Sequence, residues 1–272
     1  MQGGAVRFEG WLTALDERHL ADLSQSEVTR ALRALSSVYV ERRDRITAGA
    51  ALDGAGKRAA FALFYGPQHY LIAREVVKAL AASGDPAAVK RVIDLGCGSG
   101  AAGAAVALAY HASIDGFDLN RWAVAEAGWT YRFFGLAGRA LVMNVRAVRL
   151  EGKPGDLILA AYTLNELPDD VRDALLPRII AAHTRGASVL IVEPIGRRTN
   201  RWWPAWAAEV KARGGREDDW RFRVPLPPRQ RGLAKAAGLD VQELTARSLW
   251  LTERRIAPGE TSNDEGRTST TR

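Results

Sequence analysis

The sequence contains a single cysteine, which excludes two structural features. Cys97 has no second cysteine to pair with, so neither an intrachain disulfide nor a cysteine-rich metal site can form. A reducing cytoplasm is the simplest compartment for such a chain. Long apolar runs are also missing, because no stretch of about 18 apolar residues occurs and no transmembrane helix is expected. Residues 1–9 lack the apolar core of a signal peptide, and we expect a cytoplasmic protein.

The bulk composition is that of an ordinary globular protein with an uneven charge. The chain has 272 residues, of which 47% are hydrophobic and 25% charged, which suits one large domain or a domain with an appendage. The net charge is +7, and residues 197–235 contain eleven lysines and arginines against four acids. This segment alone therefore accounts for the whole excess. A localised basic segment favours a polyanionic partner.

The first third of the chain is expected to be helical, up to about Ser83. Ser24 or Ser26 could cap a helix whose apolar face carries residues at helical spacing, namely Val28, Leu32, Leu35 and Tyr39. Residues 48–64 predict a second helix. Gly66-Pro67 predicts a break before a third helix, which ends at residues 83–86.

After residue 86 strands alternate with helices, which is typical of a parallel sheet covered by helices. The predicted strands are Arg91–Leu95, Ser113–Asp118, Ala140–Met143, Asp156–Ala161 and Ser188–Glu193. The predicted helices are Gly100–Tyr110, Trp122–Phe134, Asp169–His183 with a break at Pro177, and Gly232–Ala237. Residues 239–252 predict a closing hairpin or long strand. We expect a helical cap over residues 1–86, a Rossmann-like domain over 87–256 and a disordered tail over 257–272.

The stretch VIDLGCGSGAAG, residues 92–103, predicts a buried strand, a glycine loop and a helix start. Gly98, Gly100 and Gly103 match the dinucleotide pattern G-x-G-x-x-G, and Asp118 lies 20 residues after Gly98. Asp94, two residues before Gly96, argues against a dinucleotide, because its carboxylate would repel a pyrophosphate. S-adenosylmethionine has no phosphate and carries an ammonium and a sulfonium, so Asp94 favours it. A carboxylate that only caps loop amides is the simpler alternative.

Polar residues also stand at the ends of the next predicted strands, where ligands of open α/β sheets bind. Asp118 could accept both ribose hydroxyls of an adenosine, or cap a turn with Asn120. Leu119 could lie on the adenine. The Asn144 side-chain oxygen could accept from the adenine amino group with Val145 as an apolar wall, or Asn144 could simply occupy a turn.

This succession of polar residues at strand ends resembles the class I methyltransferase superfamily over about residues 91–193. The segments AFALFYGPQHYLIAREVVKAL, LILAAYTLNELP and LIVEP are similar to a narrower group, the methyltransferase-like family associated with the mitochondrial small ribosomal subunit and its bacterial relatives. The resemblance implies a Rossmann-like class I methyltransferase fold, a mostly parallel sheet with helices on both faces, here with an N-terminal helical cap. It implies S-adenosylmethionine as cofactor and a role near small-subunit ribosomal RNA. Many members carry a cysteine cluster that can hold an iron–sulfur centre, and this chain has none.

These considerations give a set of candidate site residues. The cofactor would be held by Asp94, Gly96, Cys97, Gly98, Gly100, Asp118, Leu119, Asn144, Val145 and Tyr162. Asn165 and Glu166 are the polar pair best placed to orient a methyl acceptor, and Tyr65, His69 and Tyr70 could close the pocket from the cap. Asn165 is followed by Glu-Leu-Pro rather than the Asn-Pro-Pro-aromatic signature, so an exocyclic amine of a base is not supported as acceptor.

The basic segment interleaves arginines with aromatic residues. Arg197, Arg198 and Arg201 could contact phosphates while Trp202 stacks on an unpaired base. The simpler interpretation makes Trp203 and Trp206 core residues of an amphipathic helix on the sheet. The sequence predicts a methyltransferase acting on or near small-subunit ribosomal RNA, with RNA or the small subunit as partner. Two alternatives stay open: a small-molecule methyltransferase with an aromatic-lined pocket, and a non-catalytic S-adenosylmethionine-binding assembly factor.

Overall fold

The computed structural model describes residues 2–41, 52–84, 88–196, 200–239 and 241–252. One seven-stranded sheet runs through it in the order β3-β2-β1-β4-β5-β7-β6. Its strands are β1 (Arg91–Leu95), β2 (Ser113–Asp118), β3 (Gly138–Val142), β4 (Asp156–Ala161), β5 (Ser188–Glu193), β6 (Arg216–Phe222) and β7 (Leu244–Leu251). Strands β1 to β5 pair in parallel, whereas β7 is antiparallel to both β5 and β6.

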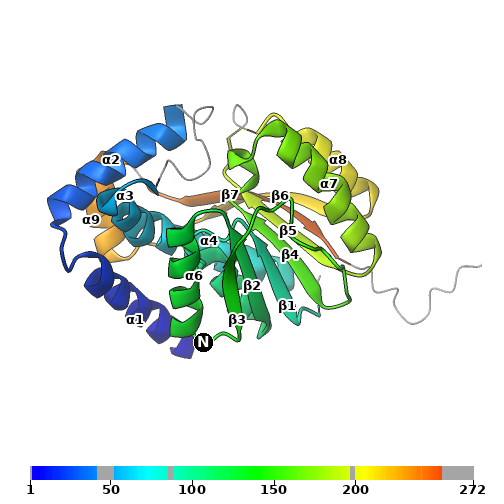
Figure 1. Cartoon of the computed structure of the whole chain (residues 1–272), viewed down its shortest axis with the longest axis horizontal. Helices are drawn as coiled ribbons and strands as arrows, with labels where there is room; N and C mark the ends of the chain where they lie inside the picture. Colours follow the sequence, from blue (N-terminus) through cyan, green and yellow to red (C-terminus); the bar gives the residue numbers. More distant parts are fainter. Residues whose placement is uncertain (1, 42–51, 85–87, 197–199, 240, 253–272) are drawn as a thin grey trace, which may run out of the picture.

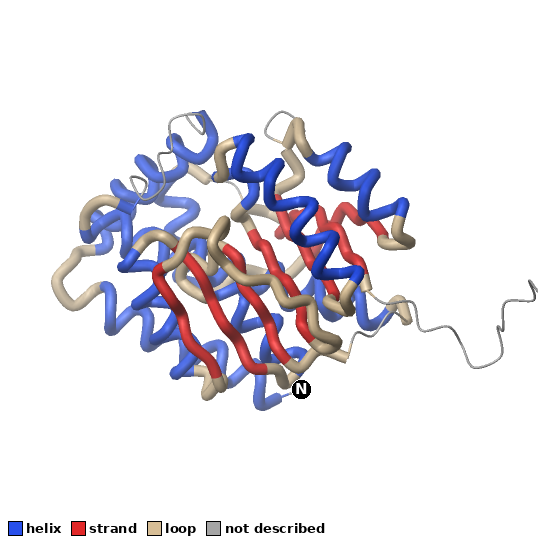
Figure 2. Tube along the Cα trace, turned by 45° about the vertical axis from the view of Figure 1, so that its right-hand side comes forward, coloured by secondary structure: helices blue, strands red, loops and turns tan. Residues whose placement is uncertain are grey.

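Helices cover both faces of this sheet, as Figure 1 and Figure 2 show. The helices are α1 (Gln2–His19), α2 (Gln25–Glu41), α3 (Ala55–Ala60), α4 (Gly66–Ala82), α5 (Ala101–Tyr110), α6 (Arg121–Phe133), α7 (Asp169–Thr184), α8 (Trp203–Ala212) and α9 (Pro228–Ala237). Side chains alternate across each strand, so Val92 and Leu159 join the core under α4 and α5, while Ile93 and Ile158 join the core under α7 and α8. The expected α/β fold with a mostly parallel sheet is confirmed.

Four of the five predicted strands have the predicted bounds. The fifth, β3, spans Gly138–Val142 and so begins two residues before the predicted start at Ala140. Strand β6 was missed. It lies in the basic segment, where charged residues hid a strand that pairs on one side only. The alternative helix with Trp203 and Trp206 as core residues is confirmed as α8, whose two indoles are buried.

The N-terminal helices are not separate from the sheet. Ser24 caps α2 in a reciprocal arrangement, because the Ser24 amide donates to Glu27 Oε2 (2.8 Å) and the Glu27 amide donates to Ser24 Oγ (3.3 Å). Helix α4 packs against α5, and α2 packs against α9 from the other end of the chain. One continuous hydrophobic core therefore joins residues of the predicted cap to the sheet.

Two predicted helix breaks are wrong, for physical reasons that the structure supplies. At Gly66-Pro67 the chain stays helical, because a π-helical turn (Phe61–Tyr65) links α3 to α4. Pro67 cannot donate to the Leu63 carbonyl, and Gln230 Nε2 donates to that oxygen instead (2.9 Å). Helix α7 likewise runs through Pro177. The carbonyl that Pro177 leaves without a helical donor belongs to Asp173, an exposed residue within reach of water.

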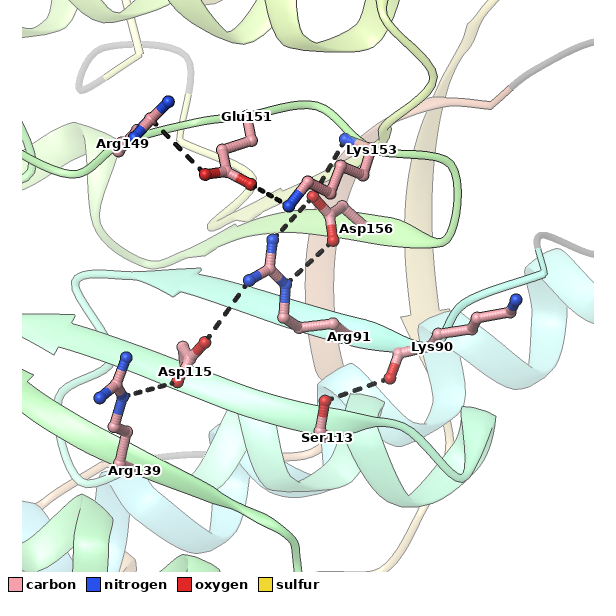
Figure 3. Close-up of polar contacts among 9 residues, drawn as sticks. All are labelled: Lys90, Arg91, Ser113, Asp115, Arg139, Arg149, Glu151, Lys153 and Asp156. Carbon is pink, nitrogen blue, oxygen red and sulfur yellow. Dashed lines mark hydrogen bonds and ion pairs between the residues drawn. The ribbon is translucent and has the colours of Figure 1, made fainter.

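At the amino ends of the strands, charged side chains form ion pairs that link neighbouring strands (Figure 3). Arg91 on β1 donates twice to Asp156 on β4, with both distances 2.9 Å, and Arg139 on β3 donates to Asp115 on β2 (3.1 Å). Glu151 lies on the loop before β4 and pairs with Arg149 and Lys153 (Figure 3).

Some expectations fall outside the described part of the chain, namely the start of the predicted helix at residue 48 and the tail over 257–272. The division at residue 86 stays a prediction. None of the helices in the described ranges is long and apolar enough to cross a membrane.

Candidate functional site

A cavity of about 650 Å³ lies at the carboxyl ends of the parallel strands. Its walls come from the loops after β1, β2, β3 and β4, the end of β5, the start of β7, and the helical face around the π turn. The volume lies within the range of small-molecule sites. This is the end of the sheet where the sequence placed the site.

The glycine loop after β1 forms one wall. Gly96, Gly98 and Gly100 have φ angles of +72°, +52° and +77°, a region that side chains disfavour. A Cβ at Gly96 would also collide with Thr163, whose Oγ1 donates to the Gly96 carbonyl (3.1 Å). The loop therefore needs glycine both for its backbone angles and for contact with the segment after β4.

Asp94 is the penultimate residue of β1, lies beside this loop and is buried. Its Oδ2 has no hydrogen-bond partner among the described residues. Burial, with repulsion from Asp118 as a second cause, raises the pKa of Asp94 to about 7, and the nearby Tyr131 hydroxyl opposes this only in part. Gly103 lets α5 approach closely, since a Cβ there would collide with Asp94 Oδ2. Burial raises the pKa of Cys97, so its thiol stays protonated. Cys97 therefore lines the cavity and does not act as a nucleophile.

Asp118 ends β2 and faces the loop. Its Oδ2 accepts from the Gly98 amide (3.0 Å) and its Oδ1 from the Asn120 amide (2.8 Å). The turn-capping role considered for Asp118 is therefore present. It does not exclude a ribose contact, because each carboxylate oxygen has two lone-pair directions and the residue lines the cavity. Leu119 lines the cavity too, with an exposed fraction of 49%.

The residues after β3 also reach the cavity. Asn144 is exposed and Val145 is buried, and both line the wall. The Asn144 side-chain oxygen accepts from the Arg146 amide (2.9 Å), so it caps a turn. This oxygen would have to serve the turn and an adenine amino group at once, and the adenine contact stays a prediction.

Aromatic rings form another part of the cavity wall. The rings of His69 and Tyr162 stack with centroids 3.9 Å apart and an interplanar angle of 7°, and Phe61 and Tyr65 lie on the same helical face as His69. Tyr162 has a φ of +59°, an unusual angle for a residue other than glycine. Burial lowers the pKa of His69 to about 3, so the imidazole is neutral.

One predicted lining residue points elsewhere. Tyr70 packs between Phe8 and Phe134, with ring centroids 4.7 Å and 5.3 Å away, and is not part of the cavity wall. Tyr65 and His69 are four residues apart and share a face, whereas Tyr70 is turned about 100° from His69 around the helix. The helical spacing could have predicted this difference.

Asn165 and Glu166, the pair predicted to orient the methyl acceptor, have different surroundings in the structure. Asn165 Nδ2 donates to Glu193 Oε2 (2.7 Å), and its Oδ1 accepts from Trp202 Nε1 (2.9 Å). Asn165 thus positions a carboxylate. Glu166 is exposed and lines the mouth of the cavity.

Glu193 is a site residue that the sequence analysis missed. It ends β5, lines the cavity and is 0% exposed. Its Oε1 accepts from the Leu164 amide (2.8 Å), in addition to the Asn165 bond. The signal was available, because Glu193 is an acid at the carboxyl end of a predicted strand, as Asp118 is in β2.

The tryptophan expected to stack on an RNA base is buried, and so is its neighbour. Trp202 is 9% exposed and Trp203 1%, so neither offers a face for stacking on a base. Arg201 is exposed and lies away from the cavity wall, while Arg197 and Arg198 lie outside the described residues. Six described basic residues of this segment have acidic partners, namely Lys211, Arg213, Arg216, Arg221, Arg223 and Arg229.

The strand order with antiparallel β7, together with the glycine loop and an acid at each of the first two strand ends, defines a class I methyltransferase fold. Residues 92–186 match the family model described as a methyltransferase domain. This chain therefore carries an S-adenosylmethionine-dependent methyltransferase domain, and the predicted cofactor is confirmed.

A solved structure agrees in fold, and a second is similar to this chain. The plantazolicin methyltransferase BpumL, solved in complex with a pentazolic desmethylPZN analog and SAH, is 12% identical with a TM-score of 0.50, covering 84% of this chain and 98% of that one. The methyltransferase domain of bacterial CtHen1 is 14% identical with a TM-score of 0.47, covering 68% and 99%. A search of curated proteins finds no match. The ribosome-associated family stays a prediction.

Proposed function

We propose that the protein transfers a methyl group from S-adenosylmethionine to a small molecule bound in this cavity. The observation that carries the proposal is the pair of stacked rings, His69 and Tyr162, which lines the same cavity as the glycine loop. A methyl acceptor held against these rings would lie next to the donor end, and positioning alone can supply about 7–11 kcal/mol of the barrier.

The residues of the donor end fit S-adenosylmethionine, which supplies a methyl group bound to a sulfonium sulfur. Asp94 has a buried oxygen that no described residue hydrogen-bonds, suited to the ammonium group. Asp118 is fixed by two backbone amides and keeps lone pairs for ribose hydroxyls. A dinucleotide does not fit, because both carboxylates would face its pyrophosphate.

RNA as the acceptor has less support. The prediction rested on Trp202 as a stacking platform and on an excess of arginine, but Trp202 is buried and most of the described basic residues have acidic partners. An RNA contact through six phosphates would give a log–log salt slope of about −4, from about 0.7 per contact. Anisotropy of a small-subunit RNA fragment across a salt series tests this, and such a slope would restore RNA as the acceptor or partner.

Isothermal titration with S-adenosylmethionine, its demethylated product and NAD tests the donor site. We expect micromolar binding of the first two and none of NAD. Asp118→Ala should weaken binding, whereas Asp115→Ala, on the same strand but paired with Arg91 and Arg139 at its amino end, is the matched control. NAD binding without a response to S-adenosylmethionine would refute the proposal. Labelled methyl transfer to added small molecules then separates an enzyme from a non-catalytic binder.

A further inference from the structure

We propose that the methyl acceptor is a phenol, a hydroxyl group on an aromatic ring, whose oxygen is bound by the Tyr162 hydroxyl and the Gln68 side-chain amide. This inference rests on the proposed function and adds the substrate class. It is carried by two buried hydrogen-bond donors without partners, by the aromatic and apolar side chains around them, and by the lone pairs that a methyl acceptor can offer.

One face of the helical segment from the π turn into α4 lines the cavity. Its lining residues recur at helical spacing and are Phe61, Tyr65, Gln68, His69 and Ile72. Four of these five side chains are aromatic or aliphatic, and the fifth, Gln68, carries an amide. A ligand that packs against this face must therefore be largely apolar, with a polar atom where the amide meets it.

Two buried polar atoms of the cavity lining have no hydrogen-bond partner among the described residues. They are Tyr162 Oη and Gln68 Nε2, and both can donate. The two side chains meet at His69, which follows Gln68 in the helix and stacks on the Tyr162 ring. A buried donor without an acceptor is costly. A ligand oxygen that accepts from both donors would remove that cost.

The Tyr162 ring is held by contacts that do not involve its hydroxyl. The Tyr162 backbone amide donates to the Val192 carbonyl on β5 (2.8 Å), and the ring stacks on His69 with centroids 3.9 Å apart. A phenylalanine could make both contacts. Within the described part of the chain the hydroxyl thus supports no other group, and it is available to a ligand.

The lone pairs of the reacting atom decide between an oxygen and a nitrogen acceptor. An amine nitrogen has a single lone pair, which must form the bond to the methyl carbon. Nothing is then left to accept from Tyr162 or Gln68. A hydroxyl oxygen keeps lone pairs for both donors while another forms the new bond. The two unpaired donors therefore favour an oxygen acceptor.

In the transfer, an oxygen lone pair forms the O–C bond, the C–S bond of the donor breaks, and its electron pair stays on sulfur. The phenolic proton passes to solvent as the bond forms, and the two donors stabilise the negative charge that develops on oxygen. An aliphatic alcohol would need a stronger base. Burial lowers the pKa of His69 to about 3, so its imidazole cannot serve as one.

The test compares hydroxyl, amino and hydroxymethyl compounds on two aromatic skeletons. The probes are 6-hydroxyquinoline, 6-aminoquinoline and 6-(hydroxymethyl)quinoline, and 5-hydroxyindole, 5-aminoindole and 5-(hydroxymethyl)indole. Each is titrated calorimetrically into the protein saturated with S-adenosylhomocysteine, and methylated products are sought by mass spectrometry with S-adenosylmethionine. We expect the phenols to bind about tenfold tighter than the amines, as two neutral hydrogen bonds provide, and to be the compounds that are methylated.

Two variants locate the effect. Tyr162→Phe and Gln68→Met should each reduce the preference for the phenols to about threefold, because each removes one of the two donors. Tyr162→Phe should unfold in urea at no lower concentration than the wild type, since the hydroxyl that it removes has no partner among the described residues. Tyr70→Phe is the matched control, because Tyr70 lies on the same helix as Gln68 but packs between Phe8 and Phe134 outside the cavity.

Amines that bind as tightly as the phenols, or hydroxymethyl compounds that are methylated as fast, would overturn the inference. So would a Tyr162→Phe variant that loses S-adenosylhomocysteine binding, because Tyr162 would then belong to the donor site. If no phenol binds a protein that binds S-adenosylhomocysteine normally, the inference fails and the proposed function stands. Failure of the wild type to bind S-adenosylhomocysteine would overturn the proposed function itself.

Discussion

Replacing Asp94 with asparagine should stabilise the cofactor-free protein at alkaline pH while weakening its binding of S-adenosylmethionine. Asp94 is buried, and one of its oxygens has no hydrogen-bond partner in the described part of the chain. Its charge is therefore costly until a cation arrives. Asparagine has nearly the same shape and no charge to bury.

The magnitude follows from the pKa. Burial and repulsion from Asp118 raise the pKa of Asp94 to about 7, whereas an aspartate in an unfolded chain has a pKa of about 3.9. Between these values the folded protein holds a proton that the unfolded chain has released, so the free energy of unfolding falls as pH rises through this window. Three pKa units amount to about 4 kcal/mol, reached above about pH 7. Cys97 and Tyr131 also face Asp94, and both stay protonated throughout, because their pKa values are raised.

The assay is thermal or urea unfolding of both proteins at about pH 4 and about pH 8. We expect Asp94→Asn to exceed the wild type by about 2–4 kcal/mol at the higher pH, a shift in Tm of about 5 °C or more, and to match it at the lower pH. Cofactor binding should depend on pH in the opposite sense to stability. The wild-type affinity for the cofactor should fall up to about tenfold per pH unit below pH 7, because only ionised Asp94 attracts the ammonium, and the variant should lose this dependence. A variant that is no more stable than the wild type at about pH 8 would refute the argument.

Three further substitutions test other parts of the site. Asp118→Ala should weaken cofactor binding by about 1.5–3 kcal/mol in titration calorimetry, and unchanged affinity in the folded variant would leave Asp118 as a turn cap only. Gly103→Ala should lower the free energy of unfolding by about 1–3 kcal/mol in urea, because its Cβ would meet Asp94 and lie 2.7 Å from Ile114 Cδ1. Trp202→Phe should cost about 1–2 kcal/mol of stability by leaving Asn165 Oδ1 without its donor, with cofactor affinity unchanged. A wild-type unfolding curve for Trp202→Phe would mean that the indole does not fix Asn165.

The donor end could be predicted from the sequence because its signals are local. Asp94 and the glycines lie within a few residues of each other, directly after the apolar pair Val92-Ile93 that indicates a buried strand. Parallel strands then bring their carboxyl ends together, so Asp118 could be placed beside the loop without knowing any contact.

Other features depend on partners distant in the chain. The π turn is compatible with Pro67 because Gln230, 167 residues away from Leu63, supplies the missing donor. The burial of Trp202 follows from Asn165 and the core under α7 and α8, not from the arginines around it. Composition also hid β6, whose pairing with β7 depends on a strand that follows it.

The expectation of a polyanionic partner came from summing charge over the segment 197–235, whereas a site responds to the charges within a short distance. At physiological ionic strength exposed charges are screened beyond about 8 Å, but buried ones are not. Most of the described basic residues of this segment are also paired with acids, as Arg221 and Arg223 are with Glu243, so the summed charge of the segment is a poor guide to its partner.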